Sequence, residues 1–309
     1  MKAIFIGDRT GLGDDIKDDF IKTGTVHILA ISGLNVVLIA GIVLAFFGIL
    51  RIPKRWNLVF TLIFLIFYTF IAAAGPPIVR AVVMFCIFVI GYLIQRDTDL
   101  LNSLSAAGLL ILLWSPQELF DPSFQLSFIS VASIVIFCPV IDRWLGIGGA
   151  PPGNLFGRIR LYALKSVSIS IAAWLGTSPV IAAYFNIASP VSIIANLIVI
   201  PMLFVLTTVS FVFFVGSQIS VIFAAGLSGL ILAIEQGIFF ANHFLSRLPL
   251  SNFRIPAPSG VFLITYYLFI FLLILPNKIE LKRLKIFKIH IFIVLLLLLN
   301  IFVWFGVYQ

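Results

Sequence analysis

Charged residues are scarce in this 309-residue chain. Asp, Glu, Lys and Arg together make up 10% of it, whereas hydrophobic residues make up 61%. Soluble domains are about a quarter charged and about half apolar. The composition therefore excludes an ordinary soluble protein and predicts an integral membrane protein, and no stretch is polar over enough residues to form a soluble domain of ordinary size.

Cysteine and histidine are also scarce. The two cysteines, Cys86 and Cys138, lie in apolar runs, which favours small buried side chains and excludes a disulfide framework or a Cys-x-x-Cys metal site. The three histidines, His27, His243 and His290, form no histidine-rich metal motif. A glycine-rich phosphate-binding loop is missing as well. The sequence therefore predicts neither a bound metal nor a cofactor.

Acidic residues are fewer than basic ones, 12 against 20, which gives a net charge of +8. In a membrane protein such an excess is typical of cytoplasmic loops. If the chain crosses the membrane ten times, thirteen of the lysines and arginines fall on one side and seven on the other. This distribution predicts a multi-pass protein of the cytoplasmic (inner) membrane with both termini extracytoplasmic.

Residues 1–24 are too polar to cross a membrane, and we expect an extracytoplasmic lead-in that contains an interfacial helix. Helical spacing places three apolar side chains on one side of that helix: Ile16, Phe20 and Ile21. Asp14 can cap the helix and Gly24 can end it. The acidic start does not resemble the basic beginning of a secretory signal peptide.

We expect the remainder, residues 25–309, to form an all-α, polytopic transmembrane helical bundle. One crossing needs about 20 apolar residues, and the number of apolar runs of about that length predicts nine or ten spans. Ser217–Leu248 fits either one span plus an interfacial helix or a bent span, and the short run Leu100–Trp114 is re-entrant or tilted. The apolar runs are Val26–Leu50, Asn57–Ala74, Ile78–Gln95, Leu100–Trp114, Phe124–Leu145, Leu161–Phe185, Val191–Val215, Ser217–Leu248, Gly260–Leu275 and Phe287–Val307.

Polar residues at the head of the first apolar run are functional candidates, because polar groups at membrane depth are costly without partners. Ser32 and Asn35 are three residues apart and share a helix face. His27 would lie about 80° round the same helix, and Gly33 permits close approach of another backbone or a break. Two explanations stay open: hydrogen bonds between helices, or the lining of a wet path.

Two more polar positions begin later spans. Arg80 follows a Gly-Pro-Pro break and is either an arginine that reaches the headgroups or a charge at the mouth of a pore. Asp121 is explained as a helix cap with Pro122 in the first turn. Gln125 runs deeper into its span, and capping does not account for it.

Mid-span polar groups complete the set. Asn196 lies five residues before Pro201, which fits a proline kink stabilised by a polar neighbour or a broken helix that lines a cavity. Glu235 is spaced by seven residues from Ser228 and from Asn242, so the three form a polar stripe on an apolar helix. We expect Glu235 to face water, a cationic partner or an amphipathic interface.

Several stretches, taken in chain order, resemble the membrane domain of the ComEC family of competence proteins. They run from about residue 5 to residue 202: Gly7–Arg9, Thr23–Leu34, Arg80–Ala81, Phe124–Phe128 and Ser189–Pro201. The family usually has a second histidine where this chain has Asn35. A role that needs two imidazoles, such as a metal site, is therefore not expected.

The resemblance implies that residues 25–309 form a permease that passes single-stranded DNA across the cytoplasmic membrane during natural transformation. It implies DNA and membrane lipids as partners, with a separate DNA receptor and a cytoplasmic motor protein, and it leaves a homo-oligomer open. The candidate lining or gating residues, none of them catalytic, are His27, Ser32, Gly33, Asn35, Arg80, Gln125, Asn196, Pro201 and Glu235.

The nuclease-like and OB-like domains of full-length family members are not found in these residues, so we expect no enzyme activity. Two alternatives remain open. One is a membrane-embedded carrier or enzyme for lipid-linked or other anionic substrates, with Glu235, His27 and Asp121 as its chemical groups. The other is one part of a split system whose soluble domains are encoded separately.

Overall fold

The computed structural model describes residues 13–29, 33–72, 75–95, 99–148, 153–218, 220–249 and 251–274, and these are almost entirely helical. The all-α prediction is confirmed, because strands are confined to two short segments among these residues. The elements are α2 (Asp14–Lys22), η1 (Val26–Ile28), α3 (Gly33–Ile49), α4 (Lys54–Ile71), α5 (Pro76–Leu93), α6 (Leu100–Trp114), η2 (Pro116–Phe120), α7 (Pro122–Trp144), α8 (Leu155–Phe185), β1 (Ile187–Ala188), α9 (Ser192–Ser217), α10 (Val221–Ser246), β2 (Phe253–Arg254) and α11 (Gly260–Ile274), where η denotes a 3₁₀ helix.

The chain divides into two compact units. Unit 1 comprises Met1–Ala132 and Ser189–Asn252, and unit 2 comprises Ser133–Ala188 and Phe253–Gln309. Every sequence-predicted site residue falls within unit 1. Unit 1 is therefore assembled from two segments of chain that are separated by an intervening stretch of unit 2.

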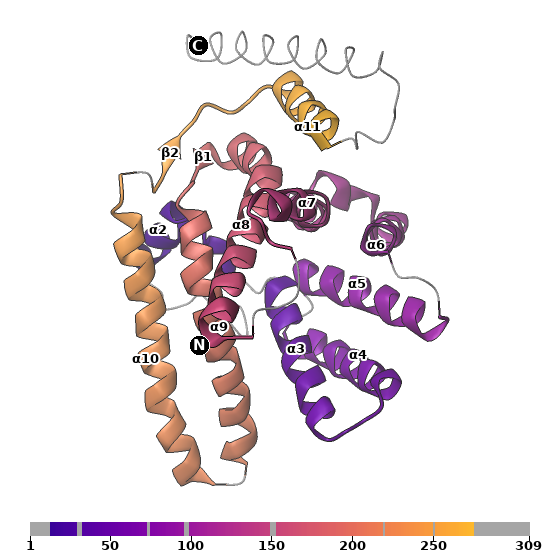
Figure 1. Ribbon diagram of the computed structural model, residues 1–309, viewed down its shortest axis with the longest axis vertical. Helices are drawn as coiled ribbons and strands as arrows, with labels where there is room; N and C mark the ends of the chain where they lie inside the picture. The colour runs from indigo at the N-terminus through magenta and orange to yellow at the C-terminus, as the bar shows by residue number, and fades with distance from the viewer. Residues whose placement is uncertain are drawn as a thin grey trace. The chain divides into compact units, whose positions relative to one another are not determined.

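The long helices α9 and α10 lie side by side in unit 1 (Figure 1). Their apolar faces and the short helix α2 enclose one core, and Phe20 of α2 is almost fully buried in it. Ile21 is 38% exposed, so only part of the predicted apolar side of α2 reaches this core. A second core of unit 1 joins α3, α4 and α5.

Among the residues that the structure describes, six helices are long and apolar enough to cross a membrane: α4, α5, α7, α8, α9 and the Ala225–Ser246 part of α10. Three more apolar helices, α3, α6 and α11, are shorter. The 17 residues of α3 rise about 25 Å at 1.5 Å per residue, slightly less than a hydrocarbon core of about 30 Å. The chain is a multi-pass membrane protein, and the predicted span Phe287–Val307 lies outside the described residues.

Three details of the sequence prediction are wrong at helix ends. The first long helix begins at Gly33 rather than Val26, because Val26–Ile28 form the separate 3₁₀ turn η1. Helix α8 begins at Leu155 rather than Leu161, because the side chain of Asn154 accepts a hydrogen bond from the amide of Gly157, 3.0 Å away, and caps it. Helix α2 begins after Gly13, and Asp14 forms an ion pair with Lys17 in place of a cap.

In unit 2, Pro179 lies inside α8 without breaking it. Proline has no amide hydrogen, so the carbonyl four residues earlier, that of Leu175, loses its helical partner. The hydroxyl of Tyr266 on α11 donates to this carbonyl at 2.7 Å, and Tyr267 donates to the next one, that of Gly176, at 2.6 Å. The carbonyl groups near Pro179 thereby become the point at which α11 is attached to α8.

Candidate functional site

The segment around His27 is a tight turn between α2 and α3. Gly24 has a φ of +71° and forms part of this turn, and the Nδ1 atom of His27 lies 3.2 Å from the carbonyl oxygen of Gly24. A Cβ atom built on Gly24 would lie 3.0 Å from the Cβ of Ser192 and 3.1 Å from that of Ser189. The exposed His27 is thus attached to a turn that packs directly on the beginning of α9.

His27 and Asn35 do not share one regular helix. His27 lies in η1 and Asn35 in α3, so the predicted angle of about 80° between them does not apply. Ser32 lies outside the described residues. Asn35 is buried, and a Cβ on Gly33 would lie 3.5 Å from the Cβ of Ala81, so the first turn of α3 packs against α5.

Arg80 forms the best-defined charged cluster of unit 1. Its side chain is only 2% exposed. Its Nη1 atom lies 3.3 Å from Oε2 of Glu118, and its Nη2 donates to Oγ of Ser123 at 2.5 Å. The guanidinium carbon lies 6.0 Å from the centre of the Phe124 ring. Arg80 does not reach outward from the protein, and its charge is opposed by Glu118, which the sequence analysis missed.

The start of α7 holds this cluster in place. Oδ1 of Asp121 accepts from the amides of Ser123 (2.6 Å) and Phe124 (3.1 Å), so the predicted helix cap is confirmed. Nε2 of Gln125 donates to the carbonyl of Leu119 at 2.9 Å. Gln125 therefore braces η2, the short helix that carries Glu118.

The polar groups of α9 and α10 are more dispersed. Helix α9 continues through Pro201 without interruption, so the broken-helix alternative is wrong for this position. Asn196 is half-buried, and its Oδ1 has no hydrogen-bond partner among the described residues. Glu235 is half-buried on α10, which is one continuous helix. The alternative of a span followed by a separate interfacial helix is therefore wrong for Ser217–Leu248.

A buried hydrogen-bond network attaches the turn after α2 to α10. Oδ1 of Asn242, which is fully buried, accepts from the hydroxyls of Thr23 (2.8 Å) and Thr25 (2.6 Å), and its Nδ2 donates to the carbonyl of Ile238 at 3.0 Å. The spacing of the α10 polar stripe pointed to Asn242, but its threonine partners are more than 200 residues away in the sequence.

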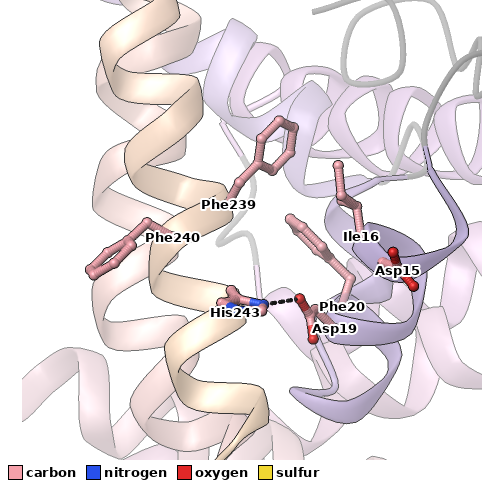
Figure 2. Close-up of a pocket in the computed structure, with 7 residues that line it drawn as sticks. All are labelled: Asp15, Ile16, Asp19, Phe20, Phe239, Phe240 and His243. Atoms are coloured by element: carbon pink, nitrogen blue, oxygen red, sulfur yellow. Dashed lines mark hydrogen bonds and ion pairs between the residues drawn. The ribbon is translucent and has the colours of Figure 1, made fainter.

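Beside this network lies a shallow pocket between α2 and α10 (Figure 2). Ile16 and Phe20 of α2 face Phe239 of α10, and Oδ2 of Asp19 lies 2.8 Å from Nδ1 of His243. The hydroxyl of Ser246 on α10 donates to the other oxygen of Asp19 at 2.6 Å.

Burial alone would raise the pKa of Asp19, but the hydrogen bonds from Ser246 and His243 outweigh it and hold this pKa below its usual range. A depressed folded-state pKa stabilises the protein above the ordinary carboxyl pKa of about 3.9, and this contribution is lost as the pH falls through the folded value. The carboxylate therefore fastens α2 to α10 at neutral pH.

We expect Asp19→Asn to lower the melting temperature at pH 7 by roughly 2–4 °C, because a charge-assisted pair of hydrogen bonds becomes neutral. The difference from wild type should persist down to about pH 4 and shrink only as the pH falls below it, because the folded-state pKa of Asp19 is lower than the ordinary carboxyl value. Thermal unfolding of the purified chain at several pH values measures both effects. The matched control is Asp18→Asn on an exposed position of the same helix; equal behaviour of the two variants would contradict the assignment.

These contacts join four motif segments of unit 1. Gly24 packs on Ser189 and Ser192, Gly33 packs on Ala81, and Arg80 bonds to Ser123. The segments are as much as 165 residues apart in the sequence, from Gly24 to Ser189, and each of these contacts joins two of them. Within the described ranges, no three His, Cys, Asp or Glu residues are arranged to hold a metal ion.

Comparison with known proteins adds the family. A family model described as "Competence protein" matches residues 4–280. ComE operon protein 3 of Bacillus subtilis (strain 168) is 27% identical over 204 residues, which cover 65% of this chain and 24% of that protein. An uncharacterized protein of Aquifex aeolicus (strain VF5) is 29% identical over 205 residues, 66% of this chain and 44% of that protein.

The uncharacterized protein YcaI of Escherichia coli (strain K12) is 26% identical over 244 residues, 76% of this chain and 30% of that protein. The chain thus spans less than half the length of these curated relatives. No solved structure matches it. Because the family model covers most of the chain and the motifs occur in family order, this multi-pass membrane protein belongs to the ComEC family of competence proteins.

Proposed function

We propose that this chain forms a path for single-stranded DNA across the cytoplasmic membrane during natural transformation. The observation that carries the proposal is the contact between motif segments in unit 1. The turn at Gly24 contacts the start of α9, Gly33 of α3 contacts Ala81 of α5, and Arg80 of α5 bonds to Ser123 at the start of α7. These segments are far apart in sequence. A structural bundle needs apolar packing between helices, whereas this region concentrates hydroxyls, an amide and a buried guanidinium.

The chemistry of the region suits a polyanion. A DNA backbone inside a membrane needs cationic or amide donors and retained water along its path. Arg80 supplies a cation and Ser123 of α7 a hydroxyl beside it, while His27 of η1 and Asn196 of α9 supply further polar side chains of unit 1. These residues, with Ser32, Asn35, Gln125 and Glu235, remain our candidates for lining or gating the path.

The proposal extends to the surroundings of the protein. We expect extracytoplasmic termini, delivery of DNA by a separate receptor, and pulling by a cytoplasmic motor protein, because no phosphate-binding loop is found in the sequence. The excess of lysine and arginine in one set of loops supports this orientation. These partners act on the chain from opposite sides of the membrane.

Deletion of the gene in a naturally competent host tests the function. We expect DNA labelled at one strand to accumulate outside the cytoplasmic membrane and not to reach the cytoplasm. Reintroduction of the wild-type gene should restore entry. The measurement is nuclease-protected label in the cytosolic fraction, and unchanged entry in the deletion strain would refute the proposal.

A further inference from the structure

Arg80 is incompletely satisfied by the groups around it. A guanidinium has five N–H donors in a planar fork. In unit 1 its Nη1 contacts Glu118, its Nη2 donates to Ser123, and its Nε, although buried, has no hydrogen-bond partner among the described residues. Buried polar atoms are nearly always hydrogen-bonded. The geometry around Arg80 therefore leaves an acceptor position open beside a positive charge.

The contact with Glu118 is weak for an ion pair. The separation of 3.3 Å exceeds the usual 2.7–2.9 Å of a charge-assisted hydrogen bond, and the contact uses one carboxylate oxygen only. Glu118 is 27% exposed and lies on η2, a 3₁₀ helix of five residues. A side chain in this position can turn towards solvent without disturbing the longer helices.

The other wall of the site is fixed. Ser123 lies in the first turn of α7, whose start is capped by Asp121. The positive end of a helix dipole favours an anion in this place. The Asp121 carboxylate already accepts hydrogen bonds from two amides of α7. Glu118 is therefore the acidic group best placed to leave Arg80 and give up its position to another anion.

We propose that Arg80 is a phosphodiester-binding group and that Glu118 occupies the phosphate position when no nucleic acid is bound. A phosphate presents several oxygens to Nη1, Nη2 and Nε at once, whereas the Glu118 carboxylate reaches Nη1 alone. The exchange lets a polyanion pass a buried cation without being trapped there, since Glu118 returns after each phosphate. This inference rests on the proposed function and names the group that contacts its substrate.

Glu118→Gln tests the exchange. The variant keeps the size of the side chain and removes the competing charge. If the conformation in which Glu118 has turned away from Arg80 makes up about a tenth of the wild-type population, removing the competing carboxylate tightens DNA binding by roughly tenfold. Binding of a fluorescent oligothymidylate to the full chain in phosphatidylcholine nanodiscs, followed by anisotropy, measures the effect.

Two further variants separate the exchange from a general change in charge. Asp18→Asn removes one exposed negative charge on α2 and should leave affinity near wild type. Arg80→Met combined with Glu118→Gln should cancel the gain. It should also reduce the slope of log K against log salt by about 0.7 relative to Glu118→Gln, the contribution of one phosphate on a single strand.

The outcomes are distinct. Unchanged or weaker binding by folded Glu118→Gln would overturn the exchange while leaving wild-type DNA binding, and hence the proposed function, intact. No DNA binding by any variant would overturn both. A second arm of the experiment replaces the oligothymidylate with phosphatidylglycerol in the nanodisc. If Glu118→Gln increases affinity only for phosphatidylglycerol, the site binds lipid phosphate and the DNA assignment is overturned.

Discussion

Arg80→Met combined with Glu118→Gln is expected to lower DNA uptake to the level of the deletion strain while the protein stays folded. Replacing a buried ion pair by neutral groups of similar volume is often neutral or stabilising, by about 1–4 kcal/mol. Arg80 is almost fully buried and Glu118 is its charged partner, so the double change removes both charges together. Uptake, measured as cytosolic nuclease-protected label, should fall because the path loses its buried cation.

Arg80→Met alone separates stability from transport. It leaves the Glu118 carboxylate without its cation, which should cost about 1–3 kcal/mol of folding free energy. Thermal unfolding in detergent should therefore rank this single variant below the double variant. Wild-type uptake by the double variant would mean that Arg80 and Glu118 form a structural pair and that the DNA path lies elsewhere.

Gly24→Ala is expected to destabilise the protein more than any other substitution that adds one methyl group in the turn after α2. Gly24 has a φ of +71°, a conformation that costs other residues about 1–2 kcal/mol. The new Cβ would also lie 3.0 Å from Ser192 and 3.1 Å from Ser189, and overpacking typically costs a further 1–3 kcal/mol. The free energy of unfolding should therefore fall by about 2–5 kcal/mol.

Gly146 supplies a matched control for the same change. It has a φ of +66°, but no atom lies within 4 Å of the Cβ that alanine would add. Gly146→Ala should therefore show the backbone cost alone. Adding Ser192→Gly to Gly24→Ala should recover part of the loss by removing the nearer contact. An equal loss in the Gly24 and Gly146 variants would contradict close packing of the turn at Gly24 on α9.

Local features were predictable where a residue acts on its own neighbourhood. The apolar run Leu100–Trp114 is a helix with the same bounds in the structure, and Asp121 caps α7 as its position before Pro122 indicated. The short helix that begins at Asp14 was predicted from the spacing of its apolar residues and from its acidic residues. Its exact cap was not, because Gly13 takes the capping position and Asp14 pairs with Lys17.

Long-range pairing was not predictable from one sequence. Nothing near Arg80 in the chain indicates that Glu118, 38 residues later, opposes its charge. The role of Gln125 was not predictable from its position in the sequence either, because its side chain turns back to bond with the carbonyl of Leu119 in η2. The turn η1 escaped detection because Val26–Ile28 were taken as the first residues of the apolar run that ends at Leu50.

The network around Asn242 has a consequence for synthesis of the protein. The acceptor for Thr23 lies 219 residues downstream, beyond the stretch of unit 2 that interrupts unit 1. At about 5–20 residues per second, the ribosome reaches it roughly 10–45 s after Thr23 has been made. Thr23 cannot form this bond before Asn242 has been made, so docking of the turn after α2 onto α10 comes late in folding.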